Sequence, residues 1–262
     1  MSGTVLNANT TGQTPVRSGI ERAALSDLGC QRENNEDFYS YWEPAREEEF
    51  LAKGRLAIVA DGMGGYEGGE MASRIAVEAI IQNYSQPKQG SPYSWLDAGF
   101  QAAHQEILDH AAKHPKLHGM GTTCTAAALV GNQVYFAHLG DSRLYLLHDN
   151  KLVRLTHDHS YVGRLVEKGV ITSQQAESHP QRHVLTAALG AGSSISPEHG
   201  DQGLTSGDVL VLCTDGLWSL VSDDEIQKAL RSSPSQACAS LIAVAKARGG
   251  PDNITLQIIA IQ

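Results

Sequence analysis

Short apolar runs that end at an aspartate are the most regular pattern along the chain. The run Leu56–Ala60 is followed by Asp61 and then by a stretch rich in glycine, up to Gly69. An apolar run of this length beside turn-forming residues is typical of a buried strand. Glycine accepts backbone conformations that other residues avoid and lets the main chain approach a ligand closely. We therefore expect a carboxylate at the rim of a sheet, a suitable place for a hard metal ion.

Three further aspartates repeat this arrangement. Asp141 lies between two strand-like runs, Asp215 follows the run 208–213, and Asp252 precedes the last run, Ile254–Ile261. Each is next to a glycine or an asparagine, so each taken alone is best explained as a turn residue. Four such positions make a chance arrangement harder to accept, although spacing alone does not decide the matter.

A shared pocket would give these carboxylates a chemical purpose. Together with the pair Glu36–Asp37, converging aspartates would repel one another, and several would have to protonate. Mg²⁺ or Mn²⁺, which prefer oxygen ligands, would relieve that repulsion. Two such ions, about 3.5–4 Å apart, can activate a water for in-line attack on phosphorus.

Helical periodicity marks the segments between the strands. Apolar residues recur at helical spacing over residues 70–84 and about 95–113, with Ser94 as the expected N-cap of the second helix. A capping box at Ser222–Glu225 opens a short helix, and residues 234–248 form another. Helices between strand regions predict a helical layer packed on a sheet.

The remaining segments are polar. Residues 1–19 contain no apolar core of a signal peptide, and we expect a disordered tail. Residues 43–54 are expected to form a solvated hairpin loop. Residues 157–190 are rich in histidine and predict an inserted flap with two short helical fragments. No repeat or linker divides the rest, so residues 20–262 are expected to form one domain.

Charge and cysteine usage narrow the class of protein. The net charge of −9 and a pI near 5.6, without a basic block, argue against a nucleic-acid partner. No apolar run is long enough to cross a membrane. No pair of cysteines has the C-x-x-C spacing of a zinc site, and three of the four lie among apolar neighbours. We expect a soluble cytoplasmic protein with reduced thiols, no membrane partner and no structural zinc.

Several stretches together resemble the metal-dependent protein serine/threonine phosphatases of the type 2C family, in its bacterial branch. The resemblance runs from about Ala23 to Ile261 and rests on the order and spacing of the motifs, since none is specific alone. The matching stretches are DLGCQRENNED (27–37), VADGMGG (59–65), GTTCTAA (121–127), HLGDSRLYLL (138–147), THDHS (156–160), HPQRHVLTAALG (179–190), LVLCTDGLW (210–218) and GGPDNITL (249–256).

The resemblance implies an α+β fold, which the residue patterns alone predict only as mixed helices and short strands. The implied architecture is a four-layer α-β-β-α sandwich of two antiparallel sheets flanked by helices, with a small flap subdomain. It also implies two or three Mn²⁺ or Mg²⁺ ions as cofactors.

Roles for single residues follow from the same resemblance. Asp61 would bridge two metal ions, with the backbone carbonyl of Gly62 as a further ligand. Asp215 and Asp252 would hold the first metal. The pair Glu36–Asp37 would contact the second metal or its waters, and which of the two binds directly is left open.

Two assignments have ordinary alternatives. Arg32 matches the phosphate-binding arginine of the family, and its planar fork suits a phosphate; the alternative is a surface salt bridge to Glu33 or Glu36. Asp141, with Asp215, matches a third metal site of bacterial members; the alternative is that it caps its own turn.

The chain departs from the animal members of the family at the position after the Asp-Gly pair. Met63 stands where those members carry a histidine proposed as the general acid, so a metal-bound water is the default proton donor. Tyr66 stands where bacterial relatives often have a histidine, and both side chains are expected to form the wall. The four flap histidines are expected to make hydrogen bonds, not to bind zinc. They are His157, His159, His179 and His183.

The function predicted on this basis is hydrolysis of phosphoserine and phosphothreonine in proteins by a metal-activated water, without a phospho-enzyme. The expected partners are phosphorylated proteins and an opposing bacterial serine/threonine kinase, and the protein is expected to be a monomer. The alternatives are a catalytically weak regulatory binding protein and a hydrolase of another phosphoester, such as a nucleotide. No cysteine lies in a C-x5-R loop, which disfavours a cysteine nucleophile.

Overall fold

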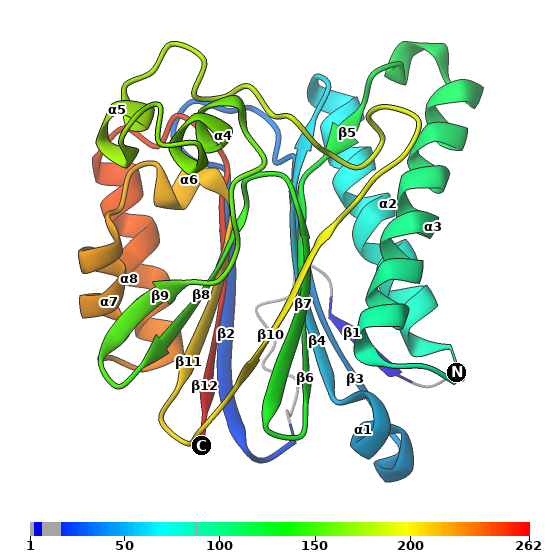
Figure 1. Cartoon of the computed structure of the whole chain (residues 1–262), viewed down its shortest axis with the longest axis vertical. Helices are drawn as coiled ribbons and strands as arrows, with labels where there is room; N and C mark the ends of the chain where they lie inside the picture. Colours follow the sequence, from blue (N-terminus) through cyan, green and yellow to red (C-terminus); the bar gives the residue numbers. More distant parts are fainter. Residues whose placement is uncertain (1–2, 7–16, 87–88) are drawn as a thin grey trace.

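Two antiparallel β-sheets pack face to face, and helices cover their outer faces (Figure 1). The structure is a computed structural model that describes residues 3–6, 17–86 and 89–262. The first sheet has the order β1 (Gly3–Leu6), β3 (Asp37–Pro44), β4 (Arg55–Met63), β6 (Cys124–Val130), β7 (Gln133–Leu139) and β10 (Glu198–Gly203), with β5 (Gly121–Thr122) paired to β4. The second has the order β2 (Ile20–Asp27), β12 (Ile254–Ile261), β11 (Val209–Cys213), β8 (Arg143–His148) and β9 (Lys151–Arg154).

Two pairs of helices form the outer layers. The helices α2 (Tyr66–Ser85) and α3 (Pro92–Lys113) cover the first sheet, and α7 (Asp223–Ala229) and α8 (Pro234–Ala247) cover the second (Figure 1). The short helices are α1 (Glu47–Lys53), α4 (Tyr161–Glu167), α5 (Ser173–Glu177), α6 (Asp215–Trp218) and a 3₁₀ turn at Pro115–Leu117. The predicted four-layer α+β sandwich is confirmed.

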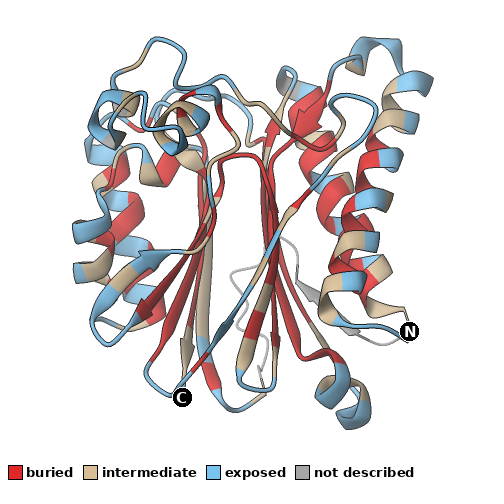
Figure 2. Ribbon diagram, in the orientation of Figure 1, coloured by how far each residue is buried: buried red, intermediate tan, exposed pale blue. Residues whose placement is uncertain are grey.

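Burial on both faces explains the continuous apolar run of β4. Leu56 and Ile58 point into the layer beneath α2 and α3, whereas Ala57 and Val59 point into the layer between the sheets. All four side chains are fully buried. A third apolar layer fills the space between the second sheet and α8, and Figure 2 shows the buried residues following the strands and the inner helix faces. A strand buried on both sides needs apolar residues at every position, so it shows no alternation.

The segment 43–54 was predicted as a solvated loop, and that prediction is wrong. Residues 47–53 form α1, whose Phe50 ring lies under the guanidinium groups of Arg17 and Arg55 at 4.6 and 4.7 Å. Lys53 is buried and donates to the main-chain carbonyls of Tyr84 and Gln86 at the end of α2. Arg17, Tyr84 and Gln86 lie far from α1 in sequence, so a polar composition alone could not reveal these partners.

Helix starts also differ from the predictions. The N-cap of α3 is Ser91, not Ser94, because Pro92 occupies the first turn and a capping box joins Ser91 to Ser94. The helix α2 begins at Tyr66, four residues earlier than predicted. The capping box at Ser222 is confirmed.

Two segments were predicted to differ from the main fold, a disordered tail at residues 1–19 and a flap at residues 157–190. Within the predicted tail 1–19, Gly3–Leu6 pairs with β3, and residues 1–2 and 7–16 lie outside the described residues. Residues 157–190 hold α4 and α5 at one end of the sandwich (Figure 1). Two isolated bridges, Ser160 with Leu185 and Thr122 with Leu189, join this segment to itself and to the core. In the part of the chain that the structure describes, no helix has the length and apolar character needed to cross a membrane.

Candidate metal and phosphate site

Strand pairing brings the predicted carboxylates to one rim of the sandwich. Asp37 opens β3 and lies directly opposite Asp61 of β4. Asp215 follows β11, and Asp252 precedes β12, the antiparallel neighbour of β11. Asp141 lies in the turn that carries the chain from β7 in one sheet to β8 in the other. Five carboxylates from separate segments therefore converge where the two sheets meet.

Four of these five carboxyl groups have raised pKa values, which indicates that they do not all ionise together without a cation. Burial raises the pKa of Asp61 well above its usual range, and Asp37, Asp215 and Asp141 raise it further. Burial raises the pKa of Asp37 to about 7, although hydrogen bonds from Thr255 and Thr214 act to lower it. Loss of water and repulsion between like charges both favour the neutral acid.

Asp215 adds a direct indication of a cation site. Its carboxyl group lies within hydrogen-bonding distance of that of Asp61, and burial raises its pKa, as does the charge of Asp252. Its Oδ1 atom is buried and has no hydrogen-bond partner among the described residues. An unpartnered buried oxygen in a group of aspartates fits a hard divalent cation, which binds oxygen ligands.

Buried hydroxyl groups fix the backbone at Asp61. The Asp61 N–H donates to Thr123 Oγ1 at 3.0 Å, and the Asp61 carbonyl accepts from the Thr123 N–H at 2.9 Å. Thr123 Oγ1 also lies 2.7 Å from Ser142 Oγ, next to Asp141. One threonine thus links two of the carboxylate-bearing segments. On the other side, Thr214 donates to Asp37 Oδ2 at 2.8 Å.

Glycines bring the backbones of the site together. A Cβ on Gly216 would overlap the carbonyl oxygen of Asn253, and one on Gly69 would overlap Glu36 Oε2. Gly216 follows Asp215, and Asn253 follows Asp252, so this close approach sets the two carboxylates side by side. At these two positions the glycines are contact points between chain segments.

Gly216→Ala is therefore expected to weaken Mn²⁺ binding by about tenfold or more, because the new methyl group pushes Asp215 away from Asp252. Calorimetric titration of Mn²⁺ into metal-free protein measures this. Gly203→Ala is the matched control, since nothing lies within 4 Å of a Cβ at that position. Equal affinities for the two variants would show that the close approach does not matter.

Arg32 meets Asp252 across the rim. Arg32 Nη2 lies 2.8 Å from Asp252 Oδ2, and 42% of the arginine side chain is exposed. The sequence alternative named Glu33 or Glu36 as the partner, whereas the ion pair is with Asp252. The guanidinium therefore stands at the edge of the carboxylate group with part of its surface open to solvent.

Glu36 and Asp37 face different surroundings. Burial raises the pKa of the Glu36 carboxyl, and Asp252 and Glu70 raise it further while Arg32 lowers it. The main-chain carbonyl of Glu36 accepts from the Gly62 N–H at 3.1 Å, which holds the loop against β4. Asp37 is directed toward the other aspartates and Thr214.

A second group of contacts holds the turn that carries Asp141. The Asp141 carbonyl accepts from the Trp218 indole at 2.9 Å, and interaction with its own backbone acts to lower the pKa of its carboxyl, against the effect of burial. Arg143 stacks on Trp218 at 3.5 Å and binds Asp158 with two hydrogen bonds of 3.0 and 2.7 Å. This ties the Asp141 turn to the start of the histidine-rich segment.

Three of the four flap histidines, His157, His159 and His179, make hydrogen bonds. His157 Nδ1 pairs with Glu198 at 2.7 Å, and His159 Nδ1 accepts from the Gly140 N–H. His138, His159 and Glu198 could together offer a metal three atoms within 4.8 Å of one another. However, His138 Nδ1 already bonds Thr125, and its Nε2 lies 3.0 Å from two main-chain carbonyls. Burial and His159 lower the pKa of His138 to about 4, so it is a neutral hydrogen-bonding residue.

Met63 and Tyr66 are the two residues that were expected to form the wall of the site. Met63 is half-buried, and the side chain of Tyr66 lies outside the described residues.

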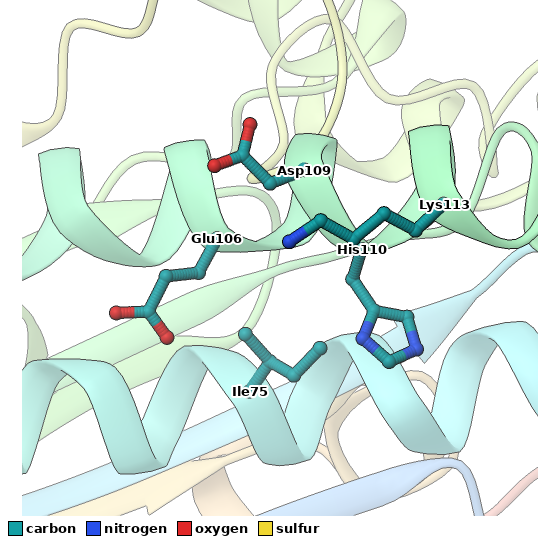
Figure 3. Close-up of a pocket in the computed structure, with 5 residues that line it drawn as sticks. All are labelled: Ile75, Glu106, Asp109, His110 and Lys113. Atoms are coloured by element: carbon teal, nitrogen blue, oxygen red, sulfur yellow. The ribbon is translucent and has the colours of Figure 1, made fainter.

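A separate hollow of about 270 Å³ lies between α2 and α3, lined by Ile75, Glu106, Asp109, His110 and Lys113 (Figure 3). It includes none of the rim aspartates, so we do not assign the chemistry to it.

Sequence reasoning assigned no role to four residues that hold this site together. They are Thr123, Thr214, Trp218 and Asn253. Each lies inside a motif quoted above, so its place beside a candidate ligand was visible. Its hydrogen-bond partner was not, because that partner belongs to another segment.

Comparison with known proteins gives a consistent result. A profile of the family described as Protein phosphatase 2C matches residues 33–241. A putative protein phosphatase 2C-type of Streptococcus pyogenes is 38% identical over 242 residues, which is 89% of this chain and 94% of that protein. The serine/threonine protein phosphatase PstP of Mycobacterium tuberculosis is 38% identical over 240 residues, which is 91% of this chain but 44% of PstP.

The solved structures agree with the sequence matches. The crystal structure of PstP superposes with a TM-score of 0.83 at 38% identity and covers 93% of this chain and 99% of that one. A structure of the PstP catalytic domain in complex with two manganese ions has a TM-score of 0.80 at 36% identity, covering 93% and 98%.

Proposed function

The chain belongs to the protein phosphatase 2C family and is a metal-dependent serine/threonine protein phosphatase, and we propose that the rim carboxylates and Arg32 are its active site. The observation that carries this proposal is the convergence of Asp252 with three aspartates whose pKa values are raised, namely Asp37, Asp61 and Asp215. Such a group of acids is stable in its ionised form only beside cations.

The proposed ligands follow from the geometry and from the family. Asp61, Asp215 and Asp252 would hold a first ion. Asp61, the Gly62 carbonyl and the Glu36–Asp37 pair would hold a second. When bound, the ions supply a water of lowered pKa as the nucleophile that attacks phosphorus.

Asp141 is the proposed ligand of a third ion, together with Asp215. Its buried carboxyl has a pKa raised by burial and by Asp215, which supports a cation there. Interaction with its own backbone acts to lower that pKa, so the turn-capping role also contributes. Two or three Mn²⁺ or Mg²⁺ ions are the proposed complement, and the manganese complex of PstP supports manganese.

Arg32 is the proposed phosphate-binding residue. Its side chain is 42% exposed and its guanidinium lies beside Asp252, so a phosphate entering the rim would meet it next to the proposed metal ligands. Two parallel N–H groups can bind two phosphate oxygens at once and orient the ester for attack from the opposite side.

The biological setting is inferred from the relatives and from the cysteines. Phosphorylated proteins are the substrates that the relatives' names imply, and we propose an opposing serine/threonine kinase and a monomeric enzyme. The four cysteines are unpaired, and three of them are buried, which supports a reducing cytoplasm.

The test is phosphate release from a phosphothreonine peptide with Mn²⁺, with and without excess chelator. We expect turnover that stops in chelator and returns when Mn²⁺ is restored. A nucleoside triphosphate serves as the competing substrate. Activity that persists in chelator would contradict the metal mechanism, and faster hydrolysis of the nucleotide would contradict the substrate class.

A further inference from the structure

The side chain of Asn253 uses all of its hydrogen-bonding groups on one loop. It is 3% exposed. Its Nδ2 donates to the main-chain carbonyls of Leu28 and Asn34, both at 3.0 Å. Its Oδ1 accepts from the main-chain N–H of Glu36 at 2.8 Å. A buried amide with both N–H groups and its oxygen engaged is a fixed anchor, because losing a partner leaves a polar group unsatisfied.

The loop between Leu28 and Glu36 carries Arg32. It crosses from β2 in the second sheet to β3 in the first and contains no strand or helix. Asn253 contacts its first residue and two residues near its end, so the three bonds bracket Arg32. Because the loop has no regular structure, the position of Arg32 depends on such hydrogen bonds.

The turn at residues 249–253, which contains Asn253, makes further contacts with this loop. The Cys30 N–H donates to the Gly250 carbonyl at 2.7 Å, and a Cβ on Gly29 would overlap the Asp252 carbonyl. Arg32 itself pairs with Asp252 at 2.8 Å. The turn at residues 249–253 therefore presents one candidate metal ligand and also determines where the guanidinium stands relative to it.

We propose that Asn253 is a positioning residue for phosphate binding, which fixes the Leu28–Glu36 loop so that Arg32 faces the incoming phosphate. This rests on the proposed function, in which Arg32 binds phosphate. Asn253 takes no part in the reaction itself, since its side chain is fully occupied by main-chain groups.

The test uses two replacements of Asn253. Asn253→Asp keeps the shape but turns an oxygen toward the carbonyls of Leu28 and Asn34. Asn253→Ser removes most of the bonds without adding charge. Asn132→Asp and Asn132→Ser are the matched controls, because Asn132 is exposed in the turn after β6, away from the rim.

The readout is binding of inorganic phosphate to the Mn²⁺-loaded protein, measured by calorimetry. Both Asn253 variants are expected to bind phosphate about tenfold more weakly, since a loosened loop loses roughly one charged hydrogen bond. Mn²⁺ affinity, titrated without phosphate, is expected to change less than about threefold, because the Asp252 carboxylate stays in place.

A double-mutant cycle with Arg32→Ala separates positioning from general damage. If Asn253 acts through Arg32, Asn253→Ser should weaken phosphate binding by less than about twofold in the Arg32→Ala protein. A full tenfold loss in that background would overturn the proposal. So would unchanged phosphate affinity in both variants, an equal loss of Mn²⁺ affinity, or variants already unfolded at 25 °C by circular dichroism.

Failure of the proposed function would look different. In that case the wild-type protein would bind phosphate in a metal-dependent way without hydrolysing phosphopeptides, or would not bind phosphate at all. The comparison between variant and wild type tests Asn253, and the wild-type activity tests the function.

Discussion

Asp61→Asn is expected to lower phosphopeptide turnover by at least about a hundredfold while the protein remains folded. Residues that only support a metal ligand typically contribute 10- to 100-fold, so a ligand shared by two ions should contribute at least the upper value, roughly a hundredfold. Asparagine keeps the shape of the protonated acid and both main-chain bonds to Thr123, since these use only backbone atoms of Asp61. The measurement is kcat with saturating Mn²⁺, together with a melting curve.

The comparison variants make this result specific. Asp215→Asn should lose turnover to a similar degree, because its Oδ1 is a buried, unpartnered oxygen. Asp224→Asn removes the same charge from an exposed position in α7 and should leave the rate unchanged. A near-wild-type rate for Asp61→Asn would remove that residue from the site.

Repeated strand-end aspartates are a pattern that sequence can reveal, and the structure explains why. Antiparallel pairing sets Asp37 opposite Asp61, and the neighbouring strands β11 and β12 set Asp215 near Asp252. A short apolar run fixes where a strand ends, and strand ends of paired segments meet. Convergence of the carboxylates thus follows from local patterns together with the sandwich of antiparallel sheets that the family resemblance implied.

The contacts that hold the site could not be predicted in the same way. Asn253 looks like an ordinary turn residue until its partners in the loop after β2 are known. Gly216 looks like the end of a strand, but its missing side chain lets the carbonyl of Asn253 approach. In both cases the partner is a backbone group of a distant segment. Backbone groups are the same in every residue type, so the sequence does not reveal which of them will be the partner.

The helix α1 is a case in which the local sequence predicted the wrong structure. Its sequence is dominated by glutamates, and composition predicted a solvated loop. Phe50 and Lys53 nevertheless find partners on three other segments, and those tertiary contacts order the helix. Local polarity therefore described the exposed face of the segment and missed the residues that dock it.

Removing the divalent ions is expected to make the stability of this protein fall as the pH rises from about 4 to about 7. In the metal-free fold, the pKa of Asp37 is raised to about 7 by burial and neighbouring aspartates, compared with about 3.9 in an unfolded chain. The folded state therefore keeps a proton that the unfolded state has already lost in this window. Stability present below pH 4 is lost as the pH passes through the raised pKa, by up to about 1.4 kcal/mol per pH unit for each such group.

Asp37→Asn isolates this contribution, because asparagine resembles the protonated acid at every pH. Metal-free Asp37→Asn and wild-type protein should have similar unfolding free energies near pH 4, and the variant should become the more stable of the two as the pH approaches 7. Urea unfolding at several pH values in the presence of chelator measures the gap. A gap that stays constant across the window would show that Asp37 ionises normally in the fold.

Adding Mn²⁺ should make the wild-type protein more stable than Asp37→Asn near pH 7, the opposite of the order expected without metal. This reversal connects stability to function. Cations replace the protons that the carboxylates must otherwise keep, so wild-type protein gains stability from Mn²⁺, and the gain grows with pH. Asp37→Asn lacks one negative charge and should gain less. The residues that make the metal-free protein least stable at neutral pH are, on this argument, the ones that bind the ions most tightly. If Mn²⁺ raised the melting temperature equally at pH 5 and pH 7.5, repulsion among the rim carboxylates would not be what the ions relieve.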